Sequence, residues 1–500
     1  MSLVVGVSSL NVLLLAAGYC ALAGPLWGRD IGCWISYAGV AFMVGAGLVV
    51  TGVFFAYIAG APNGALALAA AVVVVVSAGI GVAAASPRWR AWSAVPSSPP
   101  RECTRAAAIA ETAAFTALVA VAVILLVGGF RSSPWLDDIW GIWVPKGRTL
   151  DRIGLDQRLF APNGTYLSFG VLHYPLWWSS LTGLDLRFVR SVDLRAVAAQ
   201  DTLLLLGFLG ASARLLWTHV RPWVIGGSLL LVAALPELAR HARGGLADLP
   251  LGVYLALCGL AAFSAIARPG GFRLLLVAAF GATALQIKAE GIPQLALLGA
   301  FSLVVAWRMR PRLLSGLTAA WAVVAASAVP WQAWLRVHHV HPEETVPFLR
   351  AVDPSYLLER AGRFGPAADT LGHHLVNRHE WLLLVPLSLM LAAELALIER
   401  QLRWLSPVVL LGSLYMFWIW VYWTHPDRLE YIIDTSSYRV IDGAILLTGL
   451  SIPLLAEGLL RSDEMRARRR GRGAKIDDER RVSPGSAVRR RRAPFRRSGR

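Results

Sequence analysis

The fold is decided by residues 106–143, which read AAAIAETAAFTALVAVAVILLVGGF and then RSSPWLDDIWGIW. The first part carries a single charged side chain, Glu111. As a helix of 25 residues it is long enough to cross a hydrocarbon core about 30 Å thick. The second part places two adjacent carboxylates, Asp137 and Asp138, among three tryptophans. The stretch therefore predicts a membrane span that ends at an acidic, tryptophan-rich loop.

The composition extends this pattern to the whole chain. The 500 residues are 56% hydrophobic and only 16% charged, with a mean hydropathy of +0.56. A soluble domain carries about 25% charged residues, so much of the apolar surface of this chain must lie in lipid. We therefore predict an all-α, polytopic membrane protein. No glycine-rich phosphate loop occurs in the short loops, which argues against an ATP-driven pump.

We predict about 13 transmembrane helices, within a range of about 11 to 14, because about 20 apolar residues are needed for each span. The first segment has no basic region in front of it, so we interpret it as a retained span and not as a signal peptide. The predicted spans are residues 3–25, 33–59, 65–85, 106–130, 196–216, 222–237, 246–266, 272–288, 291–307, 313–330, 381–398, 404–424 and 439–460.

Arginines in the short loops predict the orientation, because basic loops resist translocation. If thirteen spans alternate, every arginine-rich short loop falls on the same side as the C-terminal tail. This places the N-terminus outside and the tail in the cytoplasm. The segments 131–195 and 331–380 then lie outside as long loops. Only three of the 48 basic residues are lysine, which is typical of a GC-rich bacterial genome and suggests the plasma membrane of a bacterium.

The net charge of +17 is concentrated in the tail. Residues 461–500 hold 16 basic and 5 acidic residues, which accounts for +11 of this charge. A tail of this composition is predicted to be disordered and attracted to anionic lipid headgroups. We predict no nucleic-acid partner, because the tail lacks a folded module or interleaved aromatic residues.

Asp137 and Asp138 have a chemical and a structural interpretation. A carboxylate held beside apolar rings and a second acid has a raised pKa, and it can take a proton from a sugar hydroxyl as a general base. Alternatively, one of the two acids caps a short helix, while the tryptophans anchor the chain at the membrane surface.

Five short motifs occur on the predicted outer side. They are Leu136-Asp137-Asp138, His173-Tyr174-Pro175-Leu176, Ala247-Asp248-Leu249-Pro250-Leu251, Lys288-Ala289-Glu290-Gly291 and Asp434-Thr435-Ser436-Ser437-Tyr438-Arg439. Their order and common side resemble the GT-C superfamily of integral-membrane glycosyltransferases, and in particular the protein O-mannosyltransferases and lipid A aminoarabinose transferases. In that family the acidic loop normally follows the first span, whereas here it follows the fourth.

The resemblance implies a domain organisation. Residues 1–105 are then an extra three-span module with a cytoplasmic linker, and residues 106–460 are the GT-C-like catalytic module. Residues 461–500 are the basic tail. The external segments 131–195 and 331–380 are expected to carry short helices.

The resemblance also implies a reaction and roles for these residues. A sugar moves from a polyprenyl-phosphate donor to an envelope acceptor on the outer face, with inversion. Asp137 is the implied general base, and Asp138 is implied either to support it or to orient the acceptor. Lys288 and Arg439 are the implied cations for the leaving phosphate, since developing negative charge needs nearby positive charge.

Simpler structural roles remain open for these residues. Lys288 is alternatively the ion-pair partner of Glu290 at a hairpin. Arg439 is alternatively an arginine that extends towards the interface. Asp248 follows Gly244-Gly245 and is read first as a helix N-cap, and the resemblance adds it to the substrate pocket.

The remaining predicted pocket residues are His173, Tyr174, Glu290 and Lys146. We predict no cofactor. The second external segment also contains histidines, and imidazole is a common metal ligand. Three of them are too close in sequence for most to converge, so a divalent metal is the less favoured interpretation. The histidines are His338, His339, His341, His373, His374 and His379.

The sequence therefore predicts a membrane glycosyltransferase whose partners are a polyprenyl-phosphate sugar, an envelope acceptor and membrane lipids. Two other classes stay open. The first is a multispan transporter or lipid flippase, for which charges within the membrane are the expected mark. The second is a non-catalytic envelope-assembly subunit that keeps the fold.

Overall fold

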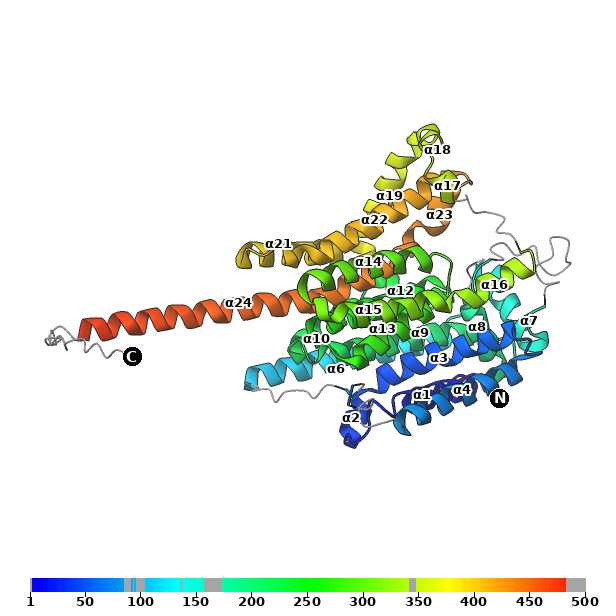
Figure 1. Cartoon of the computed structure of the whole chain (residues 1–500), viewed down its shortest axis with the longest axis horizontal. Helices are drawn as coiled ribbons and strands as arrows, with labels where there is room; N and C mark the ends of the chain where they lie inside the picture. The colour runs from blue at the N-terminus through cyan, green and yellow to red at the C-terminus, as the bar shows by residue number, and fades with distance from the viewer. Residues whose placement is uncertain are drawn as a thin grey trace, which may run out of the picture.

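A computed structural model describes residues 2–84, 91–92, 94–95, 104–134, 136, 138–156, 173–340 and 348–482, with side chains up to residue 466. Over these residues the chain is helical and contains no β-strand. Most of the long helices run side by side along one direction (Figure 1). This confirms the prediction of an all-α chain.

Ten helical segments of the described chain are long and apolar enough to cross a membrane. Seven of them are single helices: α1 (Leu3–Ala21), α3 (Ala38–Ile58), α4 (Gly64–Ala84), α6 (Arg105–Arg131), α9 (Arg195–Leu216), α12 (Asp248–Ala267) and α14 (Gly291–Met309). The other three join consecutive helices. Pro311–Val337 contains η3 (Pro311–Leu313), α15 (Leu314–Ser327) and α16 (Val329–Val337); Arg403–Thr424 contains most of η5 (Leu402–Leu405) and α22 (Ser406–Thr424); and Leu429–Arg466 contains α23 (Leu429–Val440) and the first part of α24 (Asp442–Val482).

A bent pair of helices raises this number to eleven if it is counted as one span. The segment Ala361–Trp381, which contains η4 (Ala361–Arg363), α19 (Phe364–Val376) and α20 (Arg378–Trp381), meets α21 (Leu384–Glu399) at 101°. Leu382 and Leu383 at the break have φ values of 47° and 58°, a left-handed conformation that stops a helix. Much of the segment 331–380 that was predicted to be an external loop is therefore part of apolar helices that could enter the membrane, with residues 331–337 in the segment Pro311–Val337 and residues 361–380 in the bent pair.

The sequence predicts thirteen spans, which is two more than the eleven that include the bent pair. The difference corresponds to α10 (Pro222–Ala233) and α13 (Gly271–Leu285), which are apolar but shorter than a full span. At about 1.5 Å per residue, 12 and 15 residues fall short of a hydrocarbon core about 30 Å thick. Both helices pack within the bundle, α10 against α6 and α24, and α13 against α12 and α15.

The two ends of the bundle carry different polar groups. At one end lie α7 (Val144–Ile153), α16, α18 (Pro354–Glu359) and α23, and at the other lie α2 (Ile31–Ser36) and the far part of α24 (Figure 1). Near the latter, Arg461 donates from Nη2 to the carbonyl of His219 at 2.8 Å, and Arg221 contacts Glu457 at 3.4 Å. Residues 442 and 461 on α24 are about 29 Å apart along the helix, close to one hydrocarbon thickness.

The N-terminal helices α1, α3 and α4 share one continuous core with the rest of the chain. The Tyr254 hydroxyl on α12 donates to the carbonyl of Met43 at 2.9 Å, and the Trp177 indole donates to the carbonyl of Gly47 at 3.4 Å. Helix α3 packs on α9 as well as on α1 and α4. Residues 1–84 are therefore part of the wall that supports α8 (Trp177–Val189), α9 and α12.

Glycines allow the close approach of α1 and α3. A Cβ atom at Gly18 would lie 1.7 Å from the carbonyl oxygen of Ala41, and one at Gly45 would lie 1.9 Å from that of Leu14. Both neighbours are backbone atoms, which cannot move away without moving a helix. Small residues at such crossings let helix backbones approach closely in membranes.

We predict that Gly45→Ala lowers the free energy of unfolding by about 1–3 kcal/mol or more, because overpacking forces the backbone apart. The matched control is Gly412→Ala in α22, where a Cβ atom would meet nothing within 4 Å. Thermal unfolding in detergent, followed by tryptophan fluorescence, compares the two variants. Equal stability of both variants and the wild type would contradict the close approach of α1 and α3.

Candidate functional site

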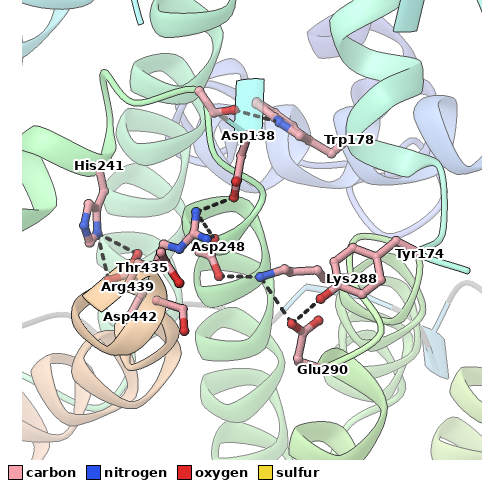
Figure 2. Close-up of polar contacts among 12 residues, drawn as sticks. Asp138, Tyr174, Trp178, His241, Asp248, Lys288, Glu290, Thr435, Arg439 and Asp442 are labelled. Atoms are coloured by element: carbon pink, nitrogen blue, oxygen red, sulfur yellow. Dashed lines mark hydrogen bonds and ion pairs between the residues drawn. The ribbon is translucent and has the colours of Figure 1, made fainter. Parts of the chain in front are cut away.

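A chain of ion pairs joins residues from four distant parts of the sequence (Figure 2). Arg439 Nη1 lies 2.5 Å from Asp138 Oδ2 and 3.9 Å from Asp248 Oδ2. Lys288 Nζ lies 2.8 Å from Asp248 Oδ1 and 3.3 Å from Glu290 Oε1. The structure thus brings five of the predicted site residues together in contacts no longer than 3.9 Å.

Asp248 lies at the centre of this chain, as the first residue of α12. Gly245 just before it has a φ of 71°, and a Cβ atom there would lie 2.1 Å from Ile139 Cδ1. The Gly245 carbonyl accepts from the Trp178 indole at 3.1 Å (Figure 2). A glycine in this left-handed turn therefore lets the start of α12 approach the segment after Asp138.

The expectation that Asp248 acts as a helix N-cap is wrong. Ala247 occupies the N-cap position of α12, and it makes no side-chain cap hydrogen bond. The Asp248 carboxylate is directed instead to Lys288 and Arg439. A side chain that is only 7% exposed must pair its charge, and two cations satisfy that need better than backbone N–H groups.

Lys288 lies in the turn between α13 and α14, in contact with two carboxylates. Burial alone would lower the pKa of its amine, but the charges of Asp248 and Glu290 outweigh burial and raise the pKa. These two carboxylates therefore favour the charged form of the Lys288 amine. The expected pair with Glu290 is present, and Asp248 is the closer partner. Since an ammonium has three donors, one donor remains for a further acceptor.

Arg439 projects from the last turn of α23, and its side chain is 11% exposed. The expectation that it extends to the membrane interface is not met, because its guanidinium faces Asp138 and Asp248 (Figure 2). Its Nε atom is buried without a hydrogen-bond partner among the described residues. A buried donor without a partner costs about 1–3 kcal/mol, so this atom is suited to an additional acceptor.

Asp138 approaches Arg439 from the first residues after α6. It precedes η1 (Ile139–Trp143), a π-helical turn, and it makes no side-chain cap hydrogen bond there. The helix-cap alternative is therefore wrong for Asp138. Asp137, the implied general base, lies outside the described residues and directly before Asp138 in the chain.

Tyr174 connects the predicted pocket residues to the ion pairs. Its hydroxyl donates to Glu290 Oε1 at 2.6 Å, and its ring lies 5.6 Å from Lys288 Nζ. Burial and the charge of Glu290 raise its pKa well above the ordinary value, so the hydroxyl stays protonated. The ring centroids of His173 and Tyr174 are 5.0 Å apart, in an edge-to-face arrangement. His173 and Tyr174 thus form one wall of the site.

Lys146 lies behind this wall, buried in α7. Burial lowers the pKa of its amine to about 7. The pKa of His173 is also lowered, first by burial and further by the nearby charge of Lys146. Lys146 is therefore a neighbour of His173.

A second buried cluster was not expected from the sequence. The Nδ1 atom of His241 in α11 (Pro236–His241) lies 2.9 Å from an Asp442 oxygen, and its Nε2 lies 3.0 Å from Glu237 Oε1. Figure 2 shows His241 and Asp442 beside Arg439, at the junction of α23 and α24. Burial alone would lower the pKa of His241, but Asp442 and Glu237 raise it to about 9.

Two further carboxylates are fully buried and form no ion pair within the described part of the chain. Asp185 in α8 and Asp201 in α9 are each 0% exposed, and they are close enough for their charges to repel. Neither oxygen of Asp185 has a hydrogen-bond partner among the described residues. Burial raises the pKa of Asp185 well above its ordinary value and so favours the neutral form of its carboxyl group. Isolated acids in apolar helices give little sequence signal, and neither was predicted.

The described histidines of the second external segment do not converge on one point. His374 pairs with Glu380 at 2.9 Å and contacts Ser437 Oγ at 3.1 Å, and His338 stacks on Trp334 with ring centroids 4.3 Å apart. His341 lies outside the described residues. Within the described part of the chain, no group of three or more His, Cys, Asp or Glu side chains could hold a metal ion.

Comparisons with protein-family models, curated proteins and solved structures find no match to this chain. The resemblance to GT-C glycosyltransferases therefore stays a prediction from the motifs. The function has to be argued from the chemistry of the site itself.

We predict that stability falls as the pH rises from about 7 to 10, because His241 has a folded pKa of about 9 against an unfolded value of about 6.5. Its protonated form contributes stability that is complete below about pH 6.5 and lost through about pH 9. The shift corresponds to about 3 kcal/mol. Unfolding temperatures in detergent between pH 6 and pH 10 measure the effect.

The variant His241→Asn is expected to lose most of this pH dependence. The control is His379→Asn, because His379 is exposed on α20, and it should keep the wild-type dependence. The same pH slope in His241→Asn as in the wild type would show that this histidine is not held in its charged form.

Proposed function

We propose that the chain is a membrane glycosyltransferase that moves a sugar from a polyprenyl-phosphate donor to an envelope acceptor. The observation that carries the proposal is the contact of Arg439 and Lys288 with Asp138, Asp248 and Glu290 at one end of the bundle. Two cations suit a phosphate leaving group, and acids beside them suit activation of a hydroxyl.

In the proposed reaction, Asp137 takes the proton of the acceptor hydroxyl. The acceptor oxygen then forms a bond to the anomeric carbon, while the bond from that carbon to the phosphate oxygen breaks. The lipid phosphate leaves with the bonding electron pair, and the configuration at carbon inverts. The reaction needs no cofactor, since Lys288 and Arg439 neutralise the charge that develops on the phosphate.

The ion pairs suit this role because they hold both cations in place before substrate arrives. Asp138 and Asp248 position the guanidinium of Arg439, and Asp248 and Glu290 position the amine of Lys288. Preorganised charges cost no rearrangement at the moment of reaction. The remaining donors, which include Arg439 Nε, are then free for phosphate oxygens. Tyr174 and His173 would flank the sugar.

The position of the site agrees with chemistry on the outer face. It lies about one hydrocarbon thickness along α24 from the cluster of Arg221, Glu457 and Arg461. The arginine-rich tail continues from that distant end of α24. If basic segments stay in the cytoplasm, the site faces outside, where polyprenyl-linked sugars meet envelope acceptors.

One observation favours a second candidate, a proton-coupled lipid flippase or transporter. Asp201 lies within the candidate span α9 and is 0% exposed, and Asp185 in the neighbouring helix α8 is also 0% exposed. Ionisable residues inside membrane helices are expensive to bury and often serve proton relays. The two candidates differ in whether a donor lipid is cleaved or only moved.

We predict that Asp137→Asn lowers sugar transfer about 10²- to 10⁴-fold, since a general base contributes that much to the rate. Lys288→Met and Arg439→Met should each lower transfer about 10²- to 10³-fold, because each removes charge stabilisation from the leaving phosphate. The assay supplies membranes containing the full-length protein with a radiolabelled polyprenyl-phosphate sugar. It measures both label transfer and release of polyprenyl phosphate.

The matched control is Asp463→Asn, which removes an exposed carboxylate from the far part of α24. This variant should transfer sugar as the wild type does. Full activity of Asp137→Asn would refute the assigned base. Full activity of both cation variants would refute the phosphate site, even if transfer itself is observed.

For the second candidate we expect a negative result. Proteoliposomes with a fluorescent polyprenyl phosphate report movement across the bilayer through its accessibility to dithionite. If the chain is a transferase, an imposed pH gradient should not change the accessible fraction, and Asp201→Asn should match the wild type. Gradient-driven movement that is lost in Asp201→Asn would favour the flippase.

A further inference from the structure

A groove of about 980 Å³ lies where α7 and α8 meet α1 and α4. This is near the upper end of the volumes of ligand pockets. None of the eight predicted site residues that belong to the described part of the chain lines it. The groove combines an apolar wall with a basic rim, and the two parts come from different helices.

The apolar wall comes from the N-terminal helices. Ala65, Leu68, Ala69 and Val72 line it from α4, and Leu13 lines it from α1. The spacing on α4 places these residues on one helix face, over about 10 Å of helix length. Helix α4 is a candidate span with only 22% of its most apolar window buried in the protein. The wall is therefore continuous with a surface that lies in lipid.

The basic rim comes from α7 and from α8 with the residues after it. Four arginines and one aspartate line the groove, so the lining carries a net charge of +3. Asp151 pairs with Arg187 at 2.5 Å. The other three arginines have no ion-pair or hydrogen-bond partner for their guanidinium groups within the described part of the chain. They are Arg148, Arg152 and Arg190.

The geometry of α7 separates this rim from the candidate functional site. Arg148 and Arg152 are four residues apart and share one helix face. Lys146 is two residues from Arg148, about 200° around the helix, and it is buried towards His173. Helix α7 thus directs Arg148 and Arg152 to the groove and Lys146 towards His173 in the candidate functional site.

We propose that this groove binds a phosphate-bearing membrane lipid, with its hydrocarbon chain along α4 and its phosphate at Arg148, Arg152 and Arg190. Guanidinium groups bind phosphate oxygens through paired hydrogen bonds. A headgroup ligand satisfies the three unpaired arginines, and an acyl chain covers the wall formed by Leu13, Leu68 and Val72. The lipid is held between the N-terminal helices and α7–α8, which gives residues 1–84 a binding role as well as a packing role.

A membrane lipid fits the groove better than a soluble phosphate. A soluble anion would use the arginines but leave the apolar wall of α1 and α4 uncovered. A lipid without charge would cover the wall but would make no use of the net charge of +3 on the lining. The combination selects a molecule that is anionic at one end and hydrocarbon at the other.

The test uses the full-length protein in nanodiscs that contain equal amounts of phosphatidylglycerol and phosphatidylcholine. Native mass spectrometry counts the lipids that stay bound after release. We expect phosphatidylglycerol to be retained over phosphatidylcholine. The variant Arg148→Gln/Arg152→Gln should retain about 10- to 30-fold less of it, the loss expected for two basic residues near a lipid headgroup.

Two further variants keep the result interpretable. Arg308→Gln/Arg310→Gln removes the same charge from exposed arginines at the end of α14, and it should bind as the wild type does. Ala69→Trp fills the apolar wall and leaves the arginines in place, and it should also lose phosphatidylglycerol. Each variant is used only if its unfolding temperature in detergent matches that of the wild type.

Three results would overturn the proposal. The first is equal retention of the two lipids by the wild type. The second is an equal loss in both arginine double variants, which would indicate a general charge effect. The third is displacement of phosphatidylglycerol by an equal concentration of inorganic phosphate, which would indicate a site for a soluble anion. The test measures binding alone, so it does not depend on the proposed transferase activity.

Discussion

The structure depends on the need to neutralise Asp248 where α12 begins. A carboxylate that is 7% exposed at the end of an apolar bundle requires cations, and Lys288 and Arg439 supply them. The two cations come from different parts of the sequence, and each contacts one more acid, Glu290 for Lys288 and Asp138 for Arg439. The pairs therefore fix the turn between α13 and α14, the end of α23 and the segment after α6 relative to one another. Removing one partner of such a buried pair costs about 3–5 kcal/mol, because the other charge is left without compensation.

Hydrophobicity made most of the helices predictable. It did not predict which helices are too short to span the membrane or where a helix bends. All thirteen predicted segments form helices, because each is an apolar stretch with few charges. The same signal cannot separate a full span from the shorter α10 and α13, which pack inside the bundle. Nor could it place the 101° bend after Trp381, since two leucines in left-handed conformation leave no mark in a hydropathy profile. The tight contact of α1 with α3 depends on Gly18 and Gly45, whose roles appear only in three dimensions.

The candidate site was predictable where polar residues interrupt apolar runs near predicted span ends. Asp138, Asp248, Lys288, Glu290 and Arg439 are such interruptions, and the structure places them in contact. His241 and Asp442 were missed because their pairing spans 201 residues and neither belongs to a motif. Asp185 and Asp201 were missed because each is a single acid in its helix and belongs to no recognised motif. The groove between α1, α4, α7 and α8 could not be predicted either, because its apolar wall and its basic rim come from helices that are far apart in the sequence.

Helix α24 connects the two polar ends of the molecule through one uninterrupted element. It begins at Asp442 beside His241 and Arg439, and its 41 residues extend about 60 Å to the basic end of the chain. A helix is stiff along its axis, so it acts as a rod: a pull or a rotation applied at one end arrives at the other. Pro453 is the one proline inside it, and it marks the position where the rod can bend. Mechanical load on the tail would therefore act first on the contacts of Arg461 with His219 and of Glu457 with Arg221, and only beyond Pro453 on the His241–Asp442 contact.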